Sequence, residues 1–478
     1  FDKILTNIEQ TSTTFVAPAV SVNAFNSLQN RNEIYYALFE PNLYPRWYGN
    51  VKKYKINTNG AILGQGMAID VEKDADAIDD ATGYFDEGAL SFWSDPSTFP
   101  PGHPLGQGDG YQVKLGGAAG ELGTTRTVYT IANDSEALRK NSVDLNSKIE
   151  YLISQANPAN DTLPFGIDKT QTTLEIDADL KDVINWILGE DVKDLDEDLD
   201  VTEASRFMSD PLHSRPVVVT YGGTEADPES TLFSTDNGGA FRAINTKNGE
   251  ELFAFIPPEL LKNQKIYLDN DASNVTDKGK SKFVYGLDGP MTIWRKESTD
   301  PDIIIETGDQ DHVYAYFGMR RGGSNYYAMD VTDTDDPQLM WTIFGPDAAY
   351  PNPDFSDLGQ TWSQPKLQKV LWGCGTSCDP ETNPSHLKDV LFFAGGYDPI
   401  HDPVYNIDDT ITLPTPTTGD RGAAIYMVDA KTGALLWSAG KSGHNLNLNG
   451  SGTGTMENSI PGDLTVADIN GDGAADII

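Results

Sequence analysis

The chain is poor in basic residues and in cysteine, and it has no long apolar run. Among its 478 residues, 34 Lys and Arg stand against 72 Asp and Glu, which gives a formal net charge of −38. A negative field of this size repels phosphate backbones and anionic lipids, so we expect no nucleic acid partner. No segment resembles a membrane span or a signal peptide. The charge suits a calcium-rich or saline exterior.

Signatures of catalysis are also missing. The chain has no Gly-rich phosphate loop with its Lys, which argues against a nucleotidase. A Ser-His-Asp or Cys-His nucleophile can be recognised only in space. His213 and Arg215 precede an apolar strand and suggest a site, but we favour a structural role for them. We predict no catalytic residues and no enzyme activity.

The two cysteines, Cys374 and Cys378, are separated by three residues. A local disulfide that pins a loop is favoured if the protein is exported. A metal pair completed by His386 is the second interpretation, since Cys and His are zinc ligands. A reduced, unpaired state is the third.

Glycine, proline and aromatic residues are abundant. The counts of 45 Gly and 28 Pro favour many turns and short strands, and 38% hydrophobic residues allow a real core. Three stretches then share one pattern, in which an apolar strand, an Asp or Asn, a turn and a strand ending in an aromatic follow one another: 241–253, 327–341 and 426–437. Repeated hairpins of this kind, preceded by the Gly-rich strands 217–223 and 390–396, are typical of propeller blades. We therefore predict a mainly β fold, a modified β-propeller with long loop and helical insertions.

The spacing of the hairpins exceeds that of compact blades, so insertions must separate their strands. We place the start of the propeller at 1–62, insertions at 63–205, and blades at 206–478, truncated after the last acidic loop. One helix is expected near 176–189, with its apolar residues on one face and Gly189 as its stop. The acidic run 191–200 after it is interpreted as a solvated loop in preference to a metal site. The chain opens on Phe1 and stops inside a predicted strand, so we expect a fragment whose missing N-terminus held an export signal.

The last acidic loop has the spacing of a calcium site. Side-chain oxygens of Asp468, Asn470, Asp472 and Asp476 alternate, and Ala474 can offer its backbone carbonyl. Gly473 takes the sixth position, where a calcium loop turns sharply. The flanking residues read as strands, so we predict a Ca²⁺ loop between strands. The alternative is an Asp/Asn/Gly-rich turn without an ion.

A second cluster repeats this spacing, with Asn274 in the place of the turning glycine. Its candidate calcium ligands are Asp269, Asp271, Ser273, Val275 and Asp277. Asn enters the left-handed region more readily than most residues, so the turn is tolerable. A solvated hairpin loop remains the favoured interpretation.

Four segments together resemble the PilY family of type IV pilus tip and biogenesis proteins: 23–41, 45–54, 210–219 and 322–333. The terminal loop completes the resemblance. It implies the C-terminal β-propeller domain of such a protein, with Ca²⁺ at Asp468, Asn470, Asp472, Ala474 and Asp476. His213 and Arg215 would then fix a blade junction.

The resemblance also implies a function and a place. Such a protein would support type IV pilus assembly, balancing extension against retraction, together with adhesion and surface motility. Its partners would be minor pilins or the major pilin and a surface or host receptor. It would be exported through the periplasm to the pilus tip, the fimbrium as a whole, the cell surface or the extracellular space.

Two alternatives remain. Segment 429–437 closely resembles the blade repeat of quinoprotein dehydrogenases, but fold does not imply chemistry, and no adjacent cysteine pair exists here. A carbohydrate-binding or protein-binding module could use the aromatic pairs Tyr84-Phe85 and Phe92-Trp93. Core anchoring by these rings is favoured, because aromatics bury large apolar areas.

Overall fold

The computed structural model describes most of the chain. These are residues 15–22, 30–56, 62–64, 75–77, 85, 88–99, 103, 108–110, 112–131, 142–144, 167, 171, 173–225, 227–271, 283–297, 304–305, 311–348, 351–373, 384–402, 404–405, 411–412, 421–450 and 454–478. The chain divides into two compact units. Unit 1 comprises Phe1–Ala132, Val143–Tyr285 and Thr299–Ile305, and unit 2 comprises Asn133–Ser142, Gly286–Ser298 and Glu306–Ile478.

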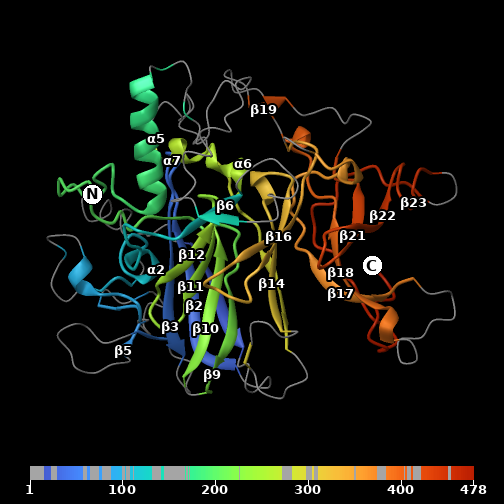
Figure 1. The fold of residues 1–478 in the computed structure, drawn as a ribbon, viewed down its shortest axis with the longest axis horizontal. Helices are drawn as coiled ribbons and strands as arrows, with labels where there is room; N and C mark the ends of the chain where they lie inside the picture. The colour runs from blue at the N-terminus through green and yellow to red at the C-terminus, as the bar shows by residue number, and fades with distance from the viewer. Residues whose placement is uncertain are drawn as a thin grey trace. The chain divides into compact units, whose positions relative to one another are not determined.

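Unit 1 is built on two six-stranded sheets (Figure 1). The first runs in chain order through β1 (Phe15–Val22), β2 (Asn30–Glu40), β3 (Tyr48–Ile56), β4 (Ile62–Gly64) and β5 (Ala75–Asp76), with β8 (Met208–Ser209) paired to β3. The second has the order β7 (Ser142–Asp144), β6 (Val128–Ile131), β12 (Glu251–Phe255), β11 (Phe241–Asn245), β10 (Pro228–Thr235) and β9 (Val217–Gly223). Glycine is required at position 49, since a Cβ there would lie 2.2 Å from the backbone oxygen of Ser209. The close β3–β8 pairing thereby brings the segment after the long insertion back to the first sheet.

Unit 2 holds a four-stranded and a five-stranded sheet. The first consists of β13 (Met291–Lys296), β14 (His312–Gly318), β15 (Tyr326–Asp330) and β16 (Gln338–Ile343) in that order. The second has the order β17 (Lys366–Leu371), β18 (Leu387–Ala394), β21 (Ala424–Asp429), β22 (Leu435–Gly440) and β23 (Leu446–Asn447), while β19 (Val404–Tyr405) and β20 (Ile411–Thr412) pair separately. The prediction of a mainly β fold is confirmed, and consecutive antiparallel strands form the meanders expected of propeller blades.

The three predicted hairpins share one register. In each, the aromatic of the last strand pairs with the residue two positions before the Asp or Asn, and a one-residue shift of register follows: Ala243↔Phe253, Ala328↔Trp341 and Met427↔Trp437. A β-bulge re-aims the strand that carries it, so the aromatic side chain takes the same direction in each hairpin.

The Trp341 side chain reaches the turn of the following hairpin in unit 2. Its indole Nε1 donates a hydrogen bond to the backbone oxygen of Ala430 at 3.1 Å, in the turn of the following hairpin. Gly433 of this turn has φ +69°, and a Cβ on it would lie 2.8 Å from the Trp341 ring. Only glycine combines that backbone conformation with so close a ring. The aromatic side chain of β16 therefore packs against the turn between β21 and β22 of the neighbouring sheet in unit 2.

The aromatic side chains of the insertion also serve packing. Trp93 is 3% exposed, donates from Nε1 to the Thr246 oxygen at 3.2 Å, and covers Gly249 as Trp341 covers Gly433. Phe85 packs against Tyr54 with ring centres 5.1 Å apart, and the Lys55 Nζ lies 4.3 Å from the centre of the Phe92 ring. Core anchoring is thus observed for Trp93 and Phe85, while Tyr84 lies outside the described residues.

A buried chain of opposite charges crosses the second sheet of unit 1. Arg242 pairs with Glu251 through Nη1 and with Asp236 through Nε, the latter at 2.6 Å, and Arg126 Nε lies 2.7 Å from Glu251 Oε1. All four side chains are nearly inaccessible to solvent. Charges so deeply buried stabilise a fold only as long as each keeps its partner.

The predicted helix is present as α5 (Thr173–Leu188), which stands out in Figure 1. Leu180, Val183, Ile184 and Ile187 are buried on one face, and Gly189, at φ +105°, ends the helix. α5 contacts α7 (Gln264–Asp269), and within the described residues the other short α-helices are α2 (Gly117–Gly120) and α6 (Pro258–Leu261). None of the helices that the structure describes has both the length and the apolar character needed to cross a membrane.

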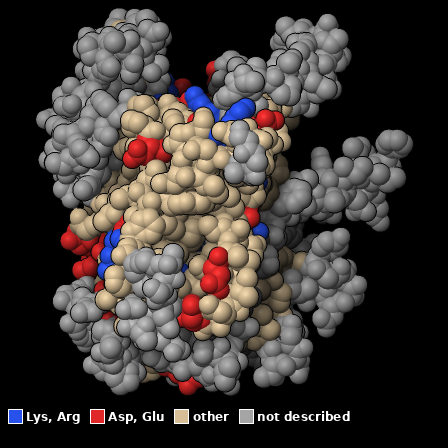
Figure 2. All heavy atoms as spheres, turned by 90° about the vertical axis from the view of Figure 1, so that its right-hand side faces the viewer, with Lys and Arg blue, Asp and Glu red and all other residues tan. Residues whose placement is uncertain are grey.

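The negative charge is unevenly distributed. On the face drawn in Figure 2, uncharged side chains cover most of the described surface and carboxylates occur in scattered groups. The acidic loops, in contrast, concentrate carboxylates within a few residues of sequence. These loops are the candidate cation sites.

Candidate metal centres

The acidic segment after α5 is closed into a loop. Glu190 and Ala204 form an isolated antiparallel bridge, and the amide of Asp191 donates to the Glu203 backbone oxygen at 2.9 Å. The amide of Ser205 donates to the Gly189 oxygen at 2.8 Å. The two ends of the loop, residues 191 and 203, are therefore held side by side at its base.

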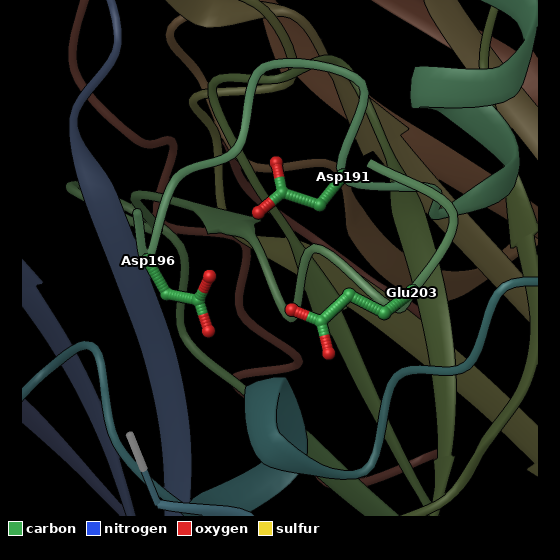
Figure 3. A group of neighbouring side chains, drawn as sticks. All are labelled: Asp191, Asp196 and Glu203. Atoms are coloured by element: carbon green, nitrogen blue, oxygen red, sulfur yellow. The ribbon is translucent and has the colours of Figure 1, made fainter. Parts of the chain in front are cut away.

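Three carboxylates converge inside this loop. Asp191, Asp196 and Glu203 each place one carboxylate oxygen within 4.8 Å of the others, and Figure 3 shows them pointing into a common space. An overlapping group is formed by Asp194, Asp196 and Asp198. Oxygen ligands that surround a calcium ion at 2.3–2.6 Å can be no farther apart than about 5 Å. The group offers three carboxylate oxygens at a spacing that one cation can bridge, out of the six to eight oxygen ligands that calcium takes.

Asp191 is the buried member of the group, and only one of its two carboxylate oxygens has a hydrogen-bond partner. It is 2% exposed, and its Oδ2 accepts a hydrogen bond from the Leu195 amide at 2.7 Å. Its Oδ1 is buried and has no hydrogen-bond partner. A buried acceptor without a donor is costly, and a cation would satisfy it.

The pKa values of the cluster reflect this crowding. Burial raises the pKa of Asp191 and the Asp196 carboxylate raises it further, against the opposing effect of the Leu195 and Lys193 amides and of Arg46. Burial also raises the pKa of Glu203, followed by the charges of Asp196 and Asp198. Both shifts show that an additional negative charge is disfavoured here, which is the condition that a divalent cation relieves.

A cavity of about 200 Å³ opens beside the cluster. Its lining includes Asp191 and Asp196 together with Tyr48, Phe99, Lys114 and Arg206. It supplies space through which an ion and its water can reach the buried carboxylate.

The interpretation of residues 191–200 as a solvated loop stays a prediction: most of these residues are exposed, whereas Asp191 is buried and converges with Asp196 and Glu203. The sequence showed a run of acids, but Glu203 lies outside that run and comes close to Asp191 only through the bridge at the base of the loop. The order of the acids in the sequence does not indicate which carboxylates converge.

The terminal loop lies between the bridged residues Ala467 and Ile477. Its shape is set by hydrogen bonds from backbone amides to side-chain oxygens. Asp468 accepts from the amides of Gly471 and Gly473, both at 2.7 Å, through its two oxygens, and Asp476 Oδ2 accepts from the Ile469 amide at 2.8 Å. The side chains of residues 468 and 476 therefore turn inward over one tight loop.

In the middle of the terminal loop, backbone amides also donate hydrogen bonds to side-chain oxygens. Asn470 Oδ1 accepts from the Asp472 amide and Asp472 Oδ1 from the Ala474 amide, each at 2.9 Å. Gly471 and Gly473 have φ of +79° and +86°, which only glycine adopts readily. In the described part of the chain, however, the carboxylates of this loop are not drawn into a close group of three as those of residues 191, 196 and 203 are. Calcium ligation by Asp468, Asn470, Asp472, Ala474 and Asp476 stays a prediction.

The second predicted calcium cluster is only partly described. Asp269 ends α7 and pairs with Lys265 Nζ at 2.9 Å, and Asn270, at φ +44°, accepts the Arg46 amide at 3.0 Å. Asp271 is exposed, and Ser273, Val275 and Asp277 lie outside the described residues. The disulfide of Cys374 and Cys378 lies outside them as well, so both predictions stay open.

A Ser-His-Asp set is present in unit 2. His444 Nδ1 lies 3.0 Å from Ser438 Oγ, and Nε2 lies 2.9 Å from Asp357 Oδ2. A hydrolase triad uses the opposite ring nitrogens, and its serine must reach substrate. Ser438 is 3% exposed within β22. The set therefore fixes the loop after β22 to Asp357.

The segment around His213 is tied to the second sheet of unit 1. Asn237 Nδ2 donates to Asp210 Oδ1 at 2.7 Å, and the Thr235 amide donates to Ser214 Oγ at 3.0 Å. These bonds join residues 210–214 to the end of β10. The structural role expected for His213 and Arg215 stays a prediction.

The fold and the acidic loops define a mainly β protein with propeller-like sheets and carboxylate clusters suited to a divalent cation. Over 186 residues the chain is 27% identical to the type IV pilus biogenesis factor PilY1 of Pseudomonas aeruginosa (strain UCBPP-PA14), covering 35% of this chain and 14% of that protein. Over 156 residues it is 22% identical to the type IV pilus biogenesis factor PilY1 homolog of Xylella fastidiosa (strain Temecula1), covering 32% of this chain and 11% of that protein. No family model matches. The two relatives confirm the resemblance to the PilY family.

A solved structure, the crystal structure of the Pseudomonas aeruginosa PilY1 C-terminal domain, aligns with 52% of this chain and 35% of that chain at 19% identity. Its TM-score of 0.29 is too low to carry an argument about the fold. The chain matches only 14% and 11% of the length of its two curated relatives.

Proposed function

We propose that the chain is a calcium-binding, non-enzymatic part of a type IV pilus-associated factor. Its role is to support pilus assembly, in which extension is balanced against retraction, together with adhesion and surface motility. It acts at the pilus tip, at the cell surface or elsewhere outside the cell. Its partners are minor pilins or the major pilin, with a surface or host receptor. The likeness to two type IV pilus biogenesis factors supports the link to pilus biogenesis. The observation that carries the calcium proposal is the buried, partnerless Oδ1 of Asp191 among converging carboxylates.

Calcium would be held at two places. One is the loop closed by Glu190 and Ala204, with Asp191, Asp196 and Glu203 as ligands. The other is the terminal loop, where Asp468, Asn470, Asp472 and Asp476 supply side-chain oxygens and Ala474 a carbonyl. The terminal loop is attached to unit 2 by the Ala475 amide, which donates to the Lys369 oxygen of β17 at 2.8 Å.

Calcium would act by making these loops rigid. The clustered carboxylates repel one another without an ion, and a divalent cation offsets that repulsion. Occupancy would then hold the loop surfaces in one conformation and so favour the extension-competent state of the pilus machinery.

Calorimetric titration with CaCl₂ after chelation tests the two sites. The unchanged chain should show two binding events, Asp191→Asn should lose one, and Asp472→Ala should lose the other. Asp200→Asn is the matched control, because Asp200 lies in the first loop but is exposed and bonded to Thr202. If Asp191→Asn and Asp472→Ala both retain two events, the ligand assignment is wrong.

Counting surface pili tests the role. Asp472→Ala, placed in the full-length protein of the source cell, should change the number of pili. If the variant has lost calcium and piliation is unchanged, the proposed switch is refuted.

A further inference from the structure

Three carboxylates alone do not fill the coordination sphere of calcium, which takes six to eight oxygen ligands. The acidic loop of unit 1 brings together one carboxylate oxygen from each of Asp191, Asp196 and Glu203. The remaining positions of an ion held there fall to water or to another oxygen donor. The identity of that donor depends on what can enter beside the cluster.

The cavity beside the cluster provides the entrance. Its volume is about 200 Å³, and Asp191 and Asp196 belong to its lining. Pockets for drug-sized ligands measure about 300–1,000 Å³, so this one has room for a single side chain. Asp191 is 2% exposed and its Oδ1 has no hydrogen-bond partner. The cavity thus leads from solvent to a buried acceptor.

The same cavity has basic residues in its lining, Lys114 and Arg206. Arg206 follows the bridged residue Ala204 by two positions, which places it at the base of the acidic loop. Its Nη1 donates a hydrogen bond to the backbone oxygen of Thr98 at 3.1 Å. In the part of the chain that the structure describes, no salt bridge joins Arg206 to a carboxylate. The guanidinium can therefore pair with an anion that enters the cavity.

Lys114 contributes a second positive charge. Its Nζ lies 4.4 Å from the centre of the Tyr48 ring and 3.4 Å from Glu40 Oε1, and about half of the side chain is exposed. Positive charges oppose the binding of a cation alone. Their presence in the lining fits an occupant that carries a negative charge of its own.

We propose that the cavity binds an acidic side chain of a protein partner, whose carboxylate completes the coordination of calcium and pairs with Arg206. The inference rests on the metal centre proposed above and names the chemistry of the partner at that centre. A protein is chosen because the proposed partners are proteins and the cavity has room for one side chain. Without the ion, the carboxylates of the cluster repel the ligand, so its binding requires calcium. By reciprocity, the ligand raises the affinity for calcium by the same factor.

The test uses a dansyl-labelled, glycine-rich pentapeptide with one central glutamate as the probe. It is titrated against the chain carrying Asp472→Ala, so that the terminal loop does not contribute, and fluorescence anisotropy is followed in CaCl₂ and in EGTA. The peptide should bind at least about tenfold more tightly in calcium, within the usual range of coupling between two sites. The same peptide with glutamine in place of glutamate should show no such difference.

Arg206→Gln separates ligand binding from ion binding. It removes a charge-assisted hydrogen bond to the ligand, so the peptide should bind about tenfold more weakly in calcium. Calcium affinity without the peptide should stay the same or rise, because a nearby positive charge is lost. General damage to the loop would weaken both. Should Arg206→Gln fail to fold, as judged by near-UV circular dichroism, Lys114→Gln provides the same comparison.

Lys193→Met is the matched control for a charge in the same loop. Lys193 does not line the cavity, its side chain is 42% exposed, and its Nζ lies 3.8 Å from Asp269 Oδ1. Solvent screens such a charge, so its removal should change peptide binding by less than about twofold.

The outcomes distinguish this inference from the proposed function. If no calcium binding is lost in Asp191→Asn, the metal centre is absent and both proposals fail. If that calcium binding exists but the glutamate peptide binds equally in CaCl₂ and EGTA, or not at all, only this inference is overturned. Displacement of the peptide by glucuronate at a lower concentration than by unlabelled peptide would assign the carboxylate to an acidic sugar and overturn the protein partner. Calcium-dependent binding that Asp191→Asn abolishes and Arg206→Gln weakens supports it.

Discussion

Asp191→Asn should affect thermal stability in opposite directions with and without calcium. The burial and neighbouring carboxylates that raise the pKa of Asp191 make its charged form unfavourable in the folded metal-free protein. A group with a raised folded pKa destabilises the fold at neutral pH relative to a neutral side chain of the same shape. Asparagine is that neutral side chain. In chelator, the variant should therefore melt at the same temperature as the parent or higher.

With calcium bound, the parent should be more stable than Asp191→Asn. We take a site with a Kd of about 10 µM, which is within the range of sensor loops. A calcium concentration of about 1 mM is then about a hundredfold above the Kd. Binding to the folded state alone then stabilises it by about 2.7 kcal/mol. With about 2–4 °C per kcal/mol for a unit of this size, the parent should gain about 5–10 °C from the first loop. Asp191→Asn should lack this gain.

Scanning calorimetry in EGTA and in calcium measures both effects, and the transition of unit 1 is followed because two units need not unfold together. Asp200→Asn, exposed in the same loop, should behave as the parent under both conditions. If Asp191→Asn destabilises equally in EGTA and in calcium, Asp191 is a structural residue and the metal argument fails.

Three further predictions concern packing, buried charge and pH. Trp341→Ala should destabilise unit 2 by about 3–5 kcal/mol, because it removes a buried indole and its bond to Ala430, and a calorimetric transition of unchanged temperature would contradict this. Glu251→Gln should destabilise unit 1 by about 3–5 kcal/mol, since it breaks two buried ion pairs, and urea unfolding that matches the parent would show the pairs to be dispensable. Calcium affinity at the first loop should fall on acidification, because Asp191 and Glu203 must be deprotonated to bind the ion. Both residues have raised pKa values, so the fall should begin above the pH of about 4 at which ordinary carboxyls titrate. Titrations at pH 7, 6 and 5 with equal affinities would refute the assignment of these ligands.

The hairpins and the helix could be predicted from sequence because their signals are local. The alternation of apolar residues around Asp330 and Asp429 determines both strands of a hairpin within about fifteen residues, and Gly433 allows the turn between them. The same holds for α5, whose apolar face and terminal Gly189 lie within one segment. Local periodicity was sufficient wherever an element is stabilised by its own neighbours in the chain.

The convergence of the first acidic cluster could not be predicted from the sequence because it is not local. Asp191 and Glu203 become neighbours through the bridge of Glu190 and Ala204. Composition could not tell a solvated acidic run from a converging one, since both contain the same residues.

The sequence alone determined the mainly β class, the blade hairpins and the spacing of the terminal loop, because each depends on residues a few positions apart. Only the tertiary structure decided that Asp191 is buried, that one of its oxygens lacks a hydrogen-bond partner, and that Asp196 and Glu203 converge with it. The physical reason is that burial and the direction of a carboxylate depend on which segments fold against it, and those segments are distant in the chain.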